Sequence, residues 1–171
     1  MKLKSKDFML RYAKKSDLKS YYKNKRNDKQ IDNGFHGYKY PYSLTAAKKD
    51  LNRAILSVKQ KDNIYFIIEV NSEAVGEISF EKIIPKLSAK IGYWIGKEYR
   101  GKGITTKAVK LAMRYIINKY NLRRIYGNVR TNNKGSTRVL GKCGFKVEGI
   151  QRRSGLKNGK YYDEYLYGRV R

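Results

Sequence analysis

The centre of the chain reads Ile91-Gly92-Tyr93-Trp94-Ile95-Gly96 and, three residues later, Arg100-Gly101-Lys102-Gly103-Ile104-Thr105. The first segment is β-branched and aromatic, as in a strand, and from Ile104 onward apolar residues recur at the period of a helix. Glycines at such a junction let the backbone approach a ligand closely, and the free N–H groups at the positive end of the new helix attract anions. We therefore predict that a phosphate group binds the backbone amides of residues 100–105.

Two glycines before a helix also occur in tight turns that bind nothing, so the junction alone leaves both interpretations open. It is not a Walker P-loop, which needs Gly-Lys-Ser/Thr after a longer glycine spacing. It also lacks the third glycine of the Rossmann fingerprint. These two nucleotide-binding folds are therefore disfavoured.

Helical and extended segments follow one another closely on both sides of the junction. Strands are expected at 8–12, 64–70, 74–84, 88–96, 124–129, 145–152 and 161–170, and helices after the capping pair Ser16-Asp17, from Ser43 toward Gln60, from Ile104 and at 136–142, with a loop at 24–42. No repeat, linker or abrupt shift in composition marks a boundary. We expect one domain, residues 1–171, of the mixed α+β class.

Several classes of site are excluded by what the chain lacks. The single Cys143 cannot form an internal disulfide, and the single His36 leaves no cluster with the spacing of metal ligands, so no metal is expected. Cys143 has no base beside it in the sequence, which favours a packing role over that of a nucleophile. No apolar run approaches the ~18 residues of a membrane span, and no signal peptide is visible. A cytoplasmic location is expected.

The formal net charge is +26. The cationic surplus lies in residues 1–60 and 101–171, whereas Lys and Arg balance Asp and Glu in residues 61–100. Such a surplus increases the affinity for polyanions such as RNA or the ribosome, and salt weakens that attraction. A general bias of composition toward Lys and Tyr explains the charge equally well, so both interpretations remain open.

Three motifs occur in the order and spacing of one known family. They are Ile91-Gly92-Tyr93-Trp94-Ile95-Gly96, then Tyr99-Arg100-Gly101-Lys102-Gly103-Ile104, and then Asn133-Lys134-Gly135-Ser136 with Val139-Leu140-Gly141-Lys142-Cys143-Gly144-Phe145. With these motifs the chain resembles the GNAT superfamily of N-acetyltransferases, and within it the RimJ/RimL-like enzymes that acetylate the N-termini of ribosomal proteins. The resemblance runs from about residue 8 to the end and is strongest from Val75 to Glu148.

The resemblance implies a fold and a cosubstrate. The fold is a twisted, mostly antiparallel sheet of about seven strands flanked by about four helices, with a splayed strand pair at the cofactor site. The cosubstrate is acetyl-CoA, and the family's motif Gln/Arg-x-x-Gly-x-Gly/Ala falls on Arg100, Gly103 and Thr105, where Thr105 departs from the small residue expected. The other expected contacts are Gly101, Lys102, Ile104, Trp94, Ile95 and Asn133, and Trp94 is as well explained by core packing.

In this family a neutral amine attacks the thioester directly within a ternary complex. The enzyme must then orient both substrates, take up the amine proton and protonate the departing thiolate. The resemblance assigns the last role to Ser136, in the pattern Asn-x-x-Ser that begins at Asn133. An N-cap role for Ser136 is the alternative. Glu77 and Glu81 share one strand face with Ser79 and are candidate bases, or else part of a solvated face.

The acceptor amine is the least determined part of the interpretation. A protein or peptide N-terminus, possibly of a ribosomal protein, ranks first. Polyamines and aminoglycosides rank second, because the position of the general-acid tyrosine of polyamine acetyltransferases is Leu140 here and the overall field repels polycations. The alternative from another class is a non-catalytic module that binds acetyl-CoA, RNA or the ribosome. A monomer and a homodimer are both compatible with the sequence.

Overall fold

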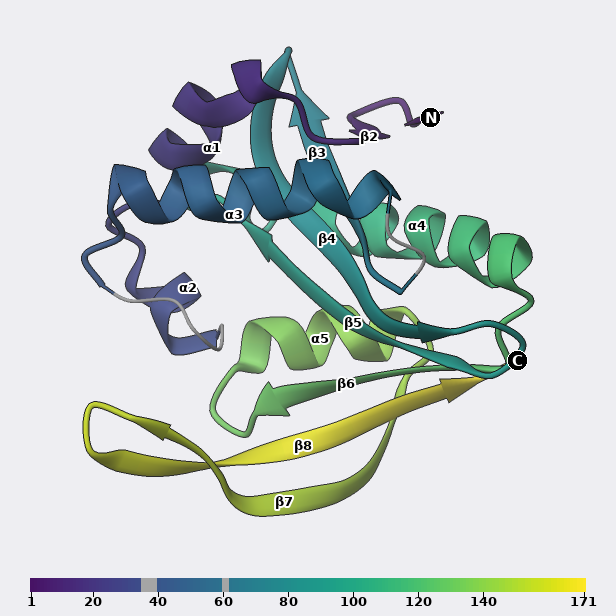
Figure 1. Cartoon of the computed structure of the whole chain (residues 1–171). Coiled ribbons are helices and arrows are strands. Elements are labelled where there is room, and N and C mark those ends of the chain that lie inside the picture. Colours follow the sequence, from purple (N-terminus) through teal and green to yellow (C-terminus); the bar gives the residue numbers. More distant parts are fainter. Residues whose placement is uncertain (35–39, 60–61) are drawn as a thin grey trace.

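The computed structural model in Figure 1 describes residues 1–34, 40–59 and 62–171. Within them, one sheet has the strand order β1-β2-β3-β4-β5-β6-β8-β7. Its strands are β1 (Lys2–Lys4), β2 (Met9–Arg11), β3 (Ile64–Val70), β4 (Glu73–Ile84), β5 (Ser88–Ile95), β6 (Arg124–Arg130), β7 (Lys146–Lys157) and β8 (Lys160–Val170). The helices are α1 (Leu18–Lys25), α2 (Lys29–Gly34), α3 (Leu44–Leu56), α4 (Ile104–Tyr120) and α5 (Lys134–Lys142). All neighbours pair antiparallel except β5 and β6. The expected mixed α/β architecture is confirmed.

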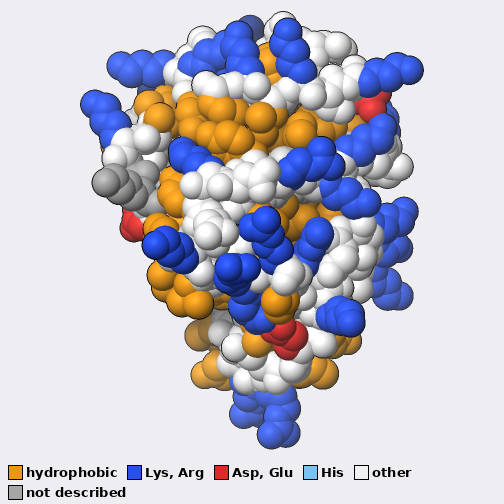
Figure 2. All heavy atoms as spheres, turned by 90° about the vertical axis from the view of Figure 1, so that its right-hand side faces the viewer, with side chains coloured by type: hydrophobic (Ala, Val, Ile, Leu, Met, Phe, Trp, Pro, Cys, Tyr) orange, Lys and Arg blue, Asp and Glu red, His pale blue; other side chains and the backbone are white. Residues whose placement is uncertain are grey.

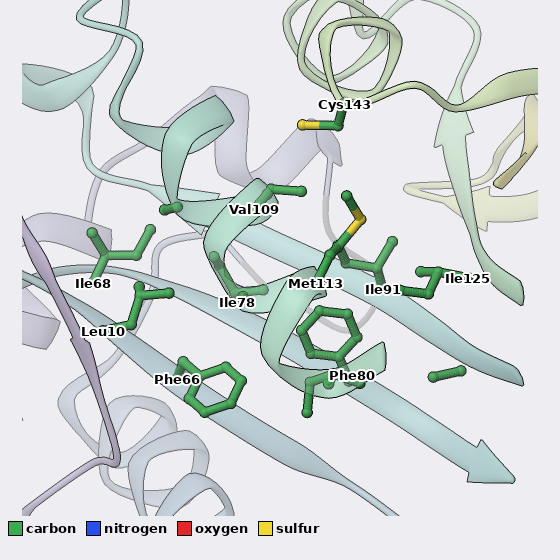
Figure 3. Close-up of a cluster of buried hydrophobic side chains, with 14 of the residues drawn as sticks. Leu10, Phe66, Ile68, Ile78, Phe80, Ile91, Val109, Met113, Ile125 and Cys143 are labelled. Atoms are coloured by element: carbon green, nitrogen blue, oxygen red, sulfur yellow. The ribbon is translucent and has the colours of Figure 1, made fainter. Parts of the chain in front are cut away.

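Helices cover both faces of this sheet. Helices α4 and α5 lie behind the sheet in Figure 1, and α1 and α3 lie in front of it. The larger apolar cluster packs between the sheet and α4, where Phe66, Phe80 and Met113 are buried (Figure 3). A smaller cluster, which contains Tyr21, Ile67 and Trp94, lies under α1 and α3. Alternate residues of β3 and β4 therefore enter different cores, as the two-residue period of a strand requires.

Strands β5 and β6 pair over only three residues each. Residues 88–90 lie opposite residues 124–126 in parallel register, and no pairing between the two strands continues beyond them. From that point β5 runs toward α1 and β6 runs toward β8 (Figure 1). The splayed strand pair that the sequence resemblance implied is therefore present, and both strands have unpaired backbone groups along the gap.

Two elements were not predicted. Strand β1 has a single apolar residue, Leu3, and α2 lies inside the segment expected to be a loop. Helix α2 begins because the carboxylate of Asp28 accepts hydrogen bonds from the N–H groups of Gln30 (3.0 Å) and Ile31 (3.3 Å). Among its residues Ile31 is the apolar anchor that is buried, so no helical period was visible in the sequence.

One local prediction was wrong, and some others differ from the structure only in their bounds. Asp17 does not cap α1, because its buried carboxylate binds the guanidinium of Arg11 at 2.7 and 2.8 Å. The helix expected after the cap Ser43 is confirmed: it ends at Leu56 and continues as a short 3₁₀ turn to Lys59, while Gln60 lies outside the described residues. Strands β7 and β8 are longer than expected and form one hairpin. His36 also lies outside the described residues.

Over the described ranges, no helix has the length and apolar character that crossing a membrane requires. These residues also contain no group of three or more His, Cys, Asp or Glu side chains that could hold a metal ion.

Gly76 holds β4 close to the end of β5, and its replacement tests that packing. A Cβ atom at Gly76 would lie 2.6 Å from the carbonyl oxygen of Trp94 and 3.1 Å from Cδ1 of Ile68. Because a backbone atom cannot move aside cheaply, we expect Gly76→Ala to lower the free energy of unfolding by about 1–3 kcal/mol. Gly141→Ala in α5 is the matched control, since nothing lies within 4 Å of its Cβ position, and it should stabilise by roughly 0.5–1 kcal/mol. Urea unfolding of both variants measures the difference, and equal stabilities would contradict the close packing.

Candidate functional site

A cleft of about 700 Å³ opens at the splayed end of β5 and β6. The residues that line it come from α2, the end of β5, the junction before α4, the first turn of α4, and one side of α5 with the two residues before it. Of the residues predicted to contact the cosubstrate, Trp94, Ile95, Arg100, Gly101, Gly103, Ile104, Thr105 and Asn133 line this cleft. Lys102 is exposed and does not line it; its ammonium lies 5.8 Å from the ring centroid of Tyr99.

The junction before α4 has the geometry of an anion site. Gly101 and Gly103 have φ angles of 76° and 75°, a left-handed conformation that glycine adopts without strain. Nothing lies within 4 Å of a Cβ atom built on either glycine, so both backbones face open space. Gly103 is the N-cap of α4 and has no side chain to bond the first-turn N–H groups. These N–H groups can therefore serve a ligand in the cleft.

A row of cations along α5 faces the same cleft. Lys134, Arg138 and Lys142 are spaced by four residues, which places them on one side of the helix, and all three line the cleft. No carboxylate pairs with any of the three in the part of the chain that the structure describes. This row was not predicted, although its four-residue spacing beside Asn133 is visible in the sequence.

The Arg100 side chain is held by three groups of the protein at the edge of the cleft. Its guanidinium binds the carboxylate of Asp28, Oε1 of Gln30, and the carbonyl oxygen of Ile95 at 3.1 Å. Arg100 therefore ties α2 to the end of β5 and fixes α2 as a wall of the cleft. Because the carboxylate of Asp28 already compensates this cation, the uncompensated cations of the cleft are those on α5.

A second cavity of about 200 Å³ spans the gap between the diverging strands. On the α3 side it is lined by Arg53, Ser79, Glu81, Lys90 and Asn128, and on the α5 side by Ser136 and Leu140. Tyr93 of β5 and Ser136 of α5 border both this cavity and the larger cleft.

Ser136 lies in the first turn of α5, and it does not open the helix as expected. The helix begins at Lys134, and its cap is Asn133, whose Oδ1 accepts a hydrogen bond from the Ser136 N–H at 3.1 Å. The carbonyl oxygen of Ser136 accepts a hydrogen bond from the Tyr93 hydroxyl at 3.2 Å. Burial raises the pKa of Tyr93, so the phenol stays protonated at neutral pH. Tyr93 was not among the predicted site residues, because an aromatic residue in a buried strand is typical of a core.

The two candidate bases differ in environment. Glu81 lines the second cavity, and one of its oxygens accepts a hydrogen bond from the Tyr65 hydroxyl at 3.1 Å. Glu77 is fully buried and lines neither space, and it accepts a hydrogen bond from the Tyr21 hydroxyl at 3.1 Å. Burial raises the pKa of Glu77, and the positive charges of Lys25 and Arg53 oppose part of that shift. The structure therefore brings Glu81 and Ser136 to one cavity and separates Glu77 from it.

The ammonium of Lys25 supplies a buried positive charge to the carboxylates of Asp50 and Glu77. The Lys25 side chain is 1% exposed, and its ammonium donates to Oδ2 of Asp50 at 2.7 Å. The rings of Tyr21, Tyr42 and Trp94 surround the ammonium with centroids 4.8–5.2 Å away. Trp94 also packs edge-on against Tyr21, which places its ring on the α1 side of β5. The expected core role of Trp94 and its place at the cleft are therefore both present.

Cys143 packs in the larger core, 1% exposed, and its thiol donates weakly to the carbonyl oxygen of Thr106 at 3.6 Å. Burial raises the pKa of this thiol. A protonated, buried thiol is not a nucleophile, so the expected packing role is confirmed.

Comparison with known proteins gives the same family that the motifs indicated. The model of the acetyltransferase (GNAT) domain matches residues 7–146. A ribosomal-protein-serine acetyltransferase of Escherichia coli is 33% identical over 106 residues, which is 61% of this chain and 59% of that enzyme. A spermidine N(1)-acetyltransferase of the same organism is 30% identical over 137 residues, 77% of this chain and 73% of that enzyme.

Among solved structures, a RimL ribosomal L7/L12 α-N-protein acetyltransferase in complex with coenzyme A superposes with a TM-score of 0.90. It is 25% identical, and the match covers 99% of this chain and 98% of that structure. The overall fold thus has a close counterpart among acetyltransferases. The chain belongs to the GNAT family and is an N-acetyltransferase that uses acetyl-CoA.

Proposed function

We propose that this N-acetyltransferase transfers the acetyl group to the α-amino group of a polypeptide. The observation that carries the proposal is the second cavity, which reaches through the sheet to Tyr93 and Ser136 and gives an acceptor its own approach from the α3 side. Arg53 and Lys90 line this cavity beside the single carboxylate Glu81. A chain with one terminal amine fits that charge pattern better than a polycation does.

We also propose how the cleft holds acetyl-CoA, which supplies the acetyl group as a thioester. The backbone N–H groups from Gly101 to Thr105 would bind the pyrophosphate, because both glycines leave the space above them open. Lys134, Arg138 and Lys142 would bind the remaining phosphate. The unpaired edge of β5 near Ile95 would align the pantetheine arm, which places the thioester beside Ser136 and Tyr93.

Glu81 and Ser136 have complementary roles in the proposed reaction. Glu81 would accept the proton that the acceptor amine releases, directly or through one water molecule, since it lies in the cavity through which the amine enters. The Ser136 hydroxyl would donate a proton to the departing thiolate. The Tyr93 hydroxyl would hold Ser136 in place, because it donates a hydrogen bond to the backbone carbonyl oxygen of Ser136. Neither step requires a nucleophilic side chain, which agrees with the buried state of Cys143.

A polyamine is the second candidate acceptor, supported by the similarity to the spermidine acetyltransferase.

The deciding experiment measures coenzyme A release with N-terminal peptides, spermidine and an aminoglycoside at equal concentrations. Peptides should give the highest kcat/KM, with an acetylated α-amine identified by mass spectrometry. A higher kcat/KM for spermidine or the aminoglycoside would overturn the proposal and leave the enzyme class unchanged.

Gly103→Val tests the phosphate site. The residue has φ 75° and an open Cβ position, so valine both strains the backbone and fills the space for the ligand. We expect acetyl-CoA affinity to fall at least ~10-fold, or ~1.4 kcal/mol, in calorimetric titrations. Gly159→Val in the β7–β8 turn has the same conformation (φ 73°) and open space, and it should destabilise the fold without changing that affinity. Equal affinities in the two variants would contradict the assignment.

Ser136→Ala separates catalysis from helix capping. Because Asn133 is the cap, Ser136→Ala should leave the melting temperature near that of the wild type and lower kcat about 10-fold or more, with acetyl-CoA affinity kept. Asn133→Ala is the structural counterpart and should cost ~1 kcal/mol of stability. Tyr93→Phe provides a further control: a large loss of kcat there, with none in Ser136→Ala, would assign the proton donor to Tyr93 instead.

Glu81→Gln tests the proposed base against its buried neighbour. A peptide α-amine has a pKa of about 8, so the need for a base grows as the pH falls. We expect Glu81→Gln to lower kcat/KM about 10-fold or more near pH 7, and Glu77→Gln to stay within about 3-fold because Glu77 lines neither space. Steady-state pH profiles of both variants decide the matter, and the reverse order would return the role to Glu77.

A further inference from the structure

The hairpin β7–β8 contains a wide bulge. Gln151 pairs with Glu164 and Gly155 pairs with Tyr162, so residues 152–154 lie opposite the single residue Asp163. The N–H of Arg153 donates to Oδ1 of Asp163 at 2.8 Å, and the Ser154 hydroxyl donates to Oε2 of Glu164 at 3.2 Å. These bonds make the bulge a defined structure and not a frayed strand.

The bulge exposes two adjacent arginines. Arg152 and Arg153 are both exposed, and Arg153 has a φ angle of 49°, a left-handed conformation that costs a non-glycine residue free energy. Next to them, the ring of Tyr162 lies against Gly155, where a Cβ atom would be 2.0 Å from the ring, and stacks on the guanidinium of Arg130 at 3.5 Å. Bulges of this kind commonly redirect side chains beside functional sites.

Two hydrogen bonds place the bulge beside both spaces of the site. Asn128, which lines the second cavity, donates its side-chain N–H to Gln151, the residue before the bulge. The N–H of Thr131 donates to the carbonyl oxygen of Asp163 at 3.1 Å, and the next residue, Asn132, lines the larger cleft. In Figure 1 the tip of the hairpin and the end of β6 lie on the same, left-hand side of the molecule.

Most of the charged side chains on the bulge and the strand segments beside it are basic. Residues 149–162 contain Arg152, Arg153, Lys157 and Lys160 and no acidic residue. Among the residues that the structure describes, no carboxylate forms an ion pair with Arg152 or Arg153. Two carboxylates also touch the bulge: Asp163 accepts a hydrogen bond from the N–H of Arg153, and Glu164 accepts one from the hydroxyl of Ser154. Basic side chains are also spread over the opposite face of the molecule (Figure 2). Charge alone therefore does not indicate where a partner binds, and it is the position beside the second cavity that distinguishes the bulge.

We infer that the bulge at Arg152 and Arg153 binds acidic side chains of the acceptor, so that the enzyme prefers polypeptides with Asp or Glu shortly after the N-terminal residue. The inference rests on the proposed peptide acceptor. A chain whose amine occupies the second cavity leaves it past Asn128 and Gln151, and arginine is suited to paired hydrogen bonds with carboxylates. RNA is the less suitable occupant, because it has no α-amine to enter the adjoining cavity.

The test compares two peptides with the same first two residues and either Asp/Glu or Asn/Gln at positions 3–6. At low ionic strength we expect kcat/KM for the acidic peptide to be roughly 5- to 10-fold higher, as two or more exposed ion pairs provide, and the difference to shrink as salt is added. The double variant Arg152→Gln/Arg153→Gln should lose the preference and retain the wild-type kcat/KM for the neutral peptide and the wild-type KM for acetyl-CoA.

A matched control removes two charges elsewhere. Lys82→Gln/Lys86→Gln alters two exposed lysines, one near the end of β4 and one in the β4–β5 turn, at the other end of the sheet, and should keep the preference. Equal rates for both peptides in the wild type, or a preference that survives in the arginine variant, would overturn the inference and leave the peptide acceptor standing. Turnover of spermidine alone would overturn both. Loss of RNA-oligomer binding in the arginine variant with an unchanged peptide preference would assign the bulge to nucleic acid.

Discussion

The short parallel pairing of β5 with β6 is the constraint on which the site depends. Three residues of each strand hold the two halves of the sheet together, and beyond them the strands separate. The separation leaves backbone groups of β5 unpaired on one side and opens a cavity through the sheet on the other. If the pairing continued, β5 and β6 would close the gap between them, and the second cavity that borders Tyr93 and Ser136 would not form.

Much of this arrangement could be predicted from the sequence because its signals are local. The glycines at 101 and 103 are needed for their backbone conformation, and the apolar period from Ile104 defines α4 independently of its surroundings. Most strands were visible for the same reason. The site elements that were missed depend on distant contacts: α2 is held by Asp28 and Arg100, which are 72 residues apart, and no pattern within 27–34 indicates a helix.

The sequence could not show which of the two candidate carboxylates faces the cavity. Glu77 and Glu81 have the same residue type, the same strand and the same face, so their pattern cannot distinguish them. The difference arises from α1 and α3, which cover Glu77 with Tyr21 and leave Glu81 at the cavity. Likewise, the apolar and aromatic alternation of β5 gave no hint that the Tyr93 hydroxyl reaches across the splay to α5. Packing decides which of several equivalent polar groups can take part in chemistry.

The buried ammonium of Lys25, surrounded by aromatic rings, limits which substitutions this sequence can accept during evolution. Removing Lys25 alone would leave the carboxylates of Asp50 and Glu77 without their buried cation, and breaking such a pair typically costs ~3–5 kcal/mol. A simultaneous exchange of all three for apolar residues avoids that penalty. Substitutions at positions 25, 50 and 77 are therefore non-additive, and homologous sequences should gain or lose these three charges as a set.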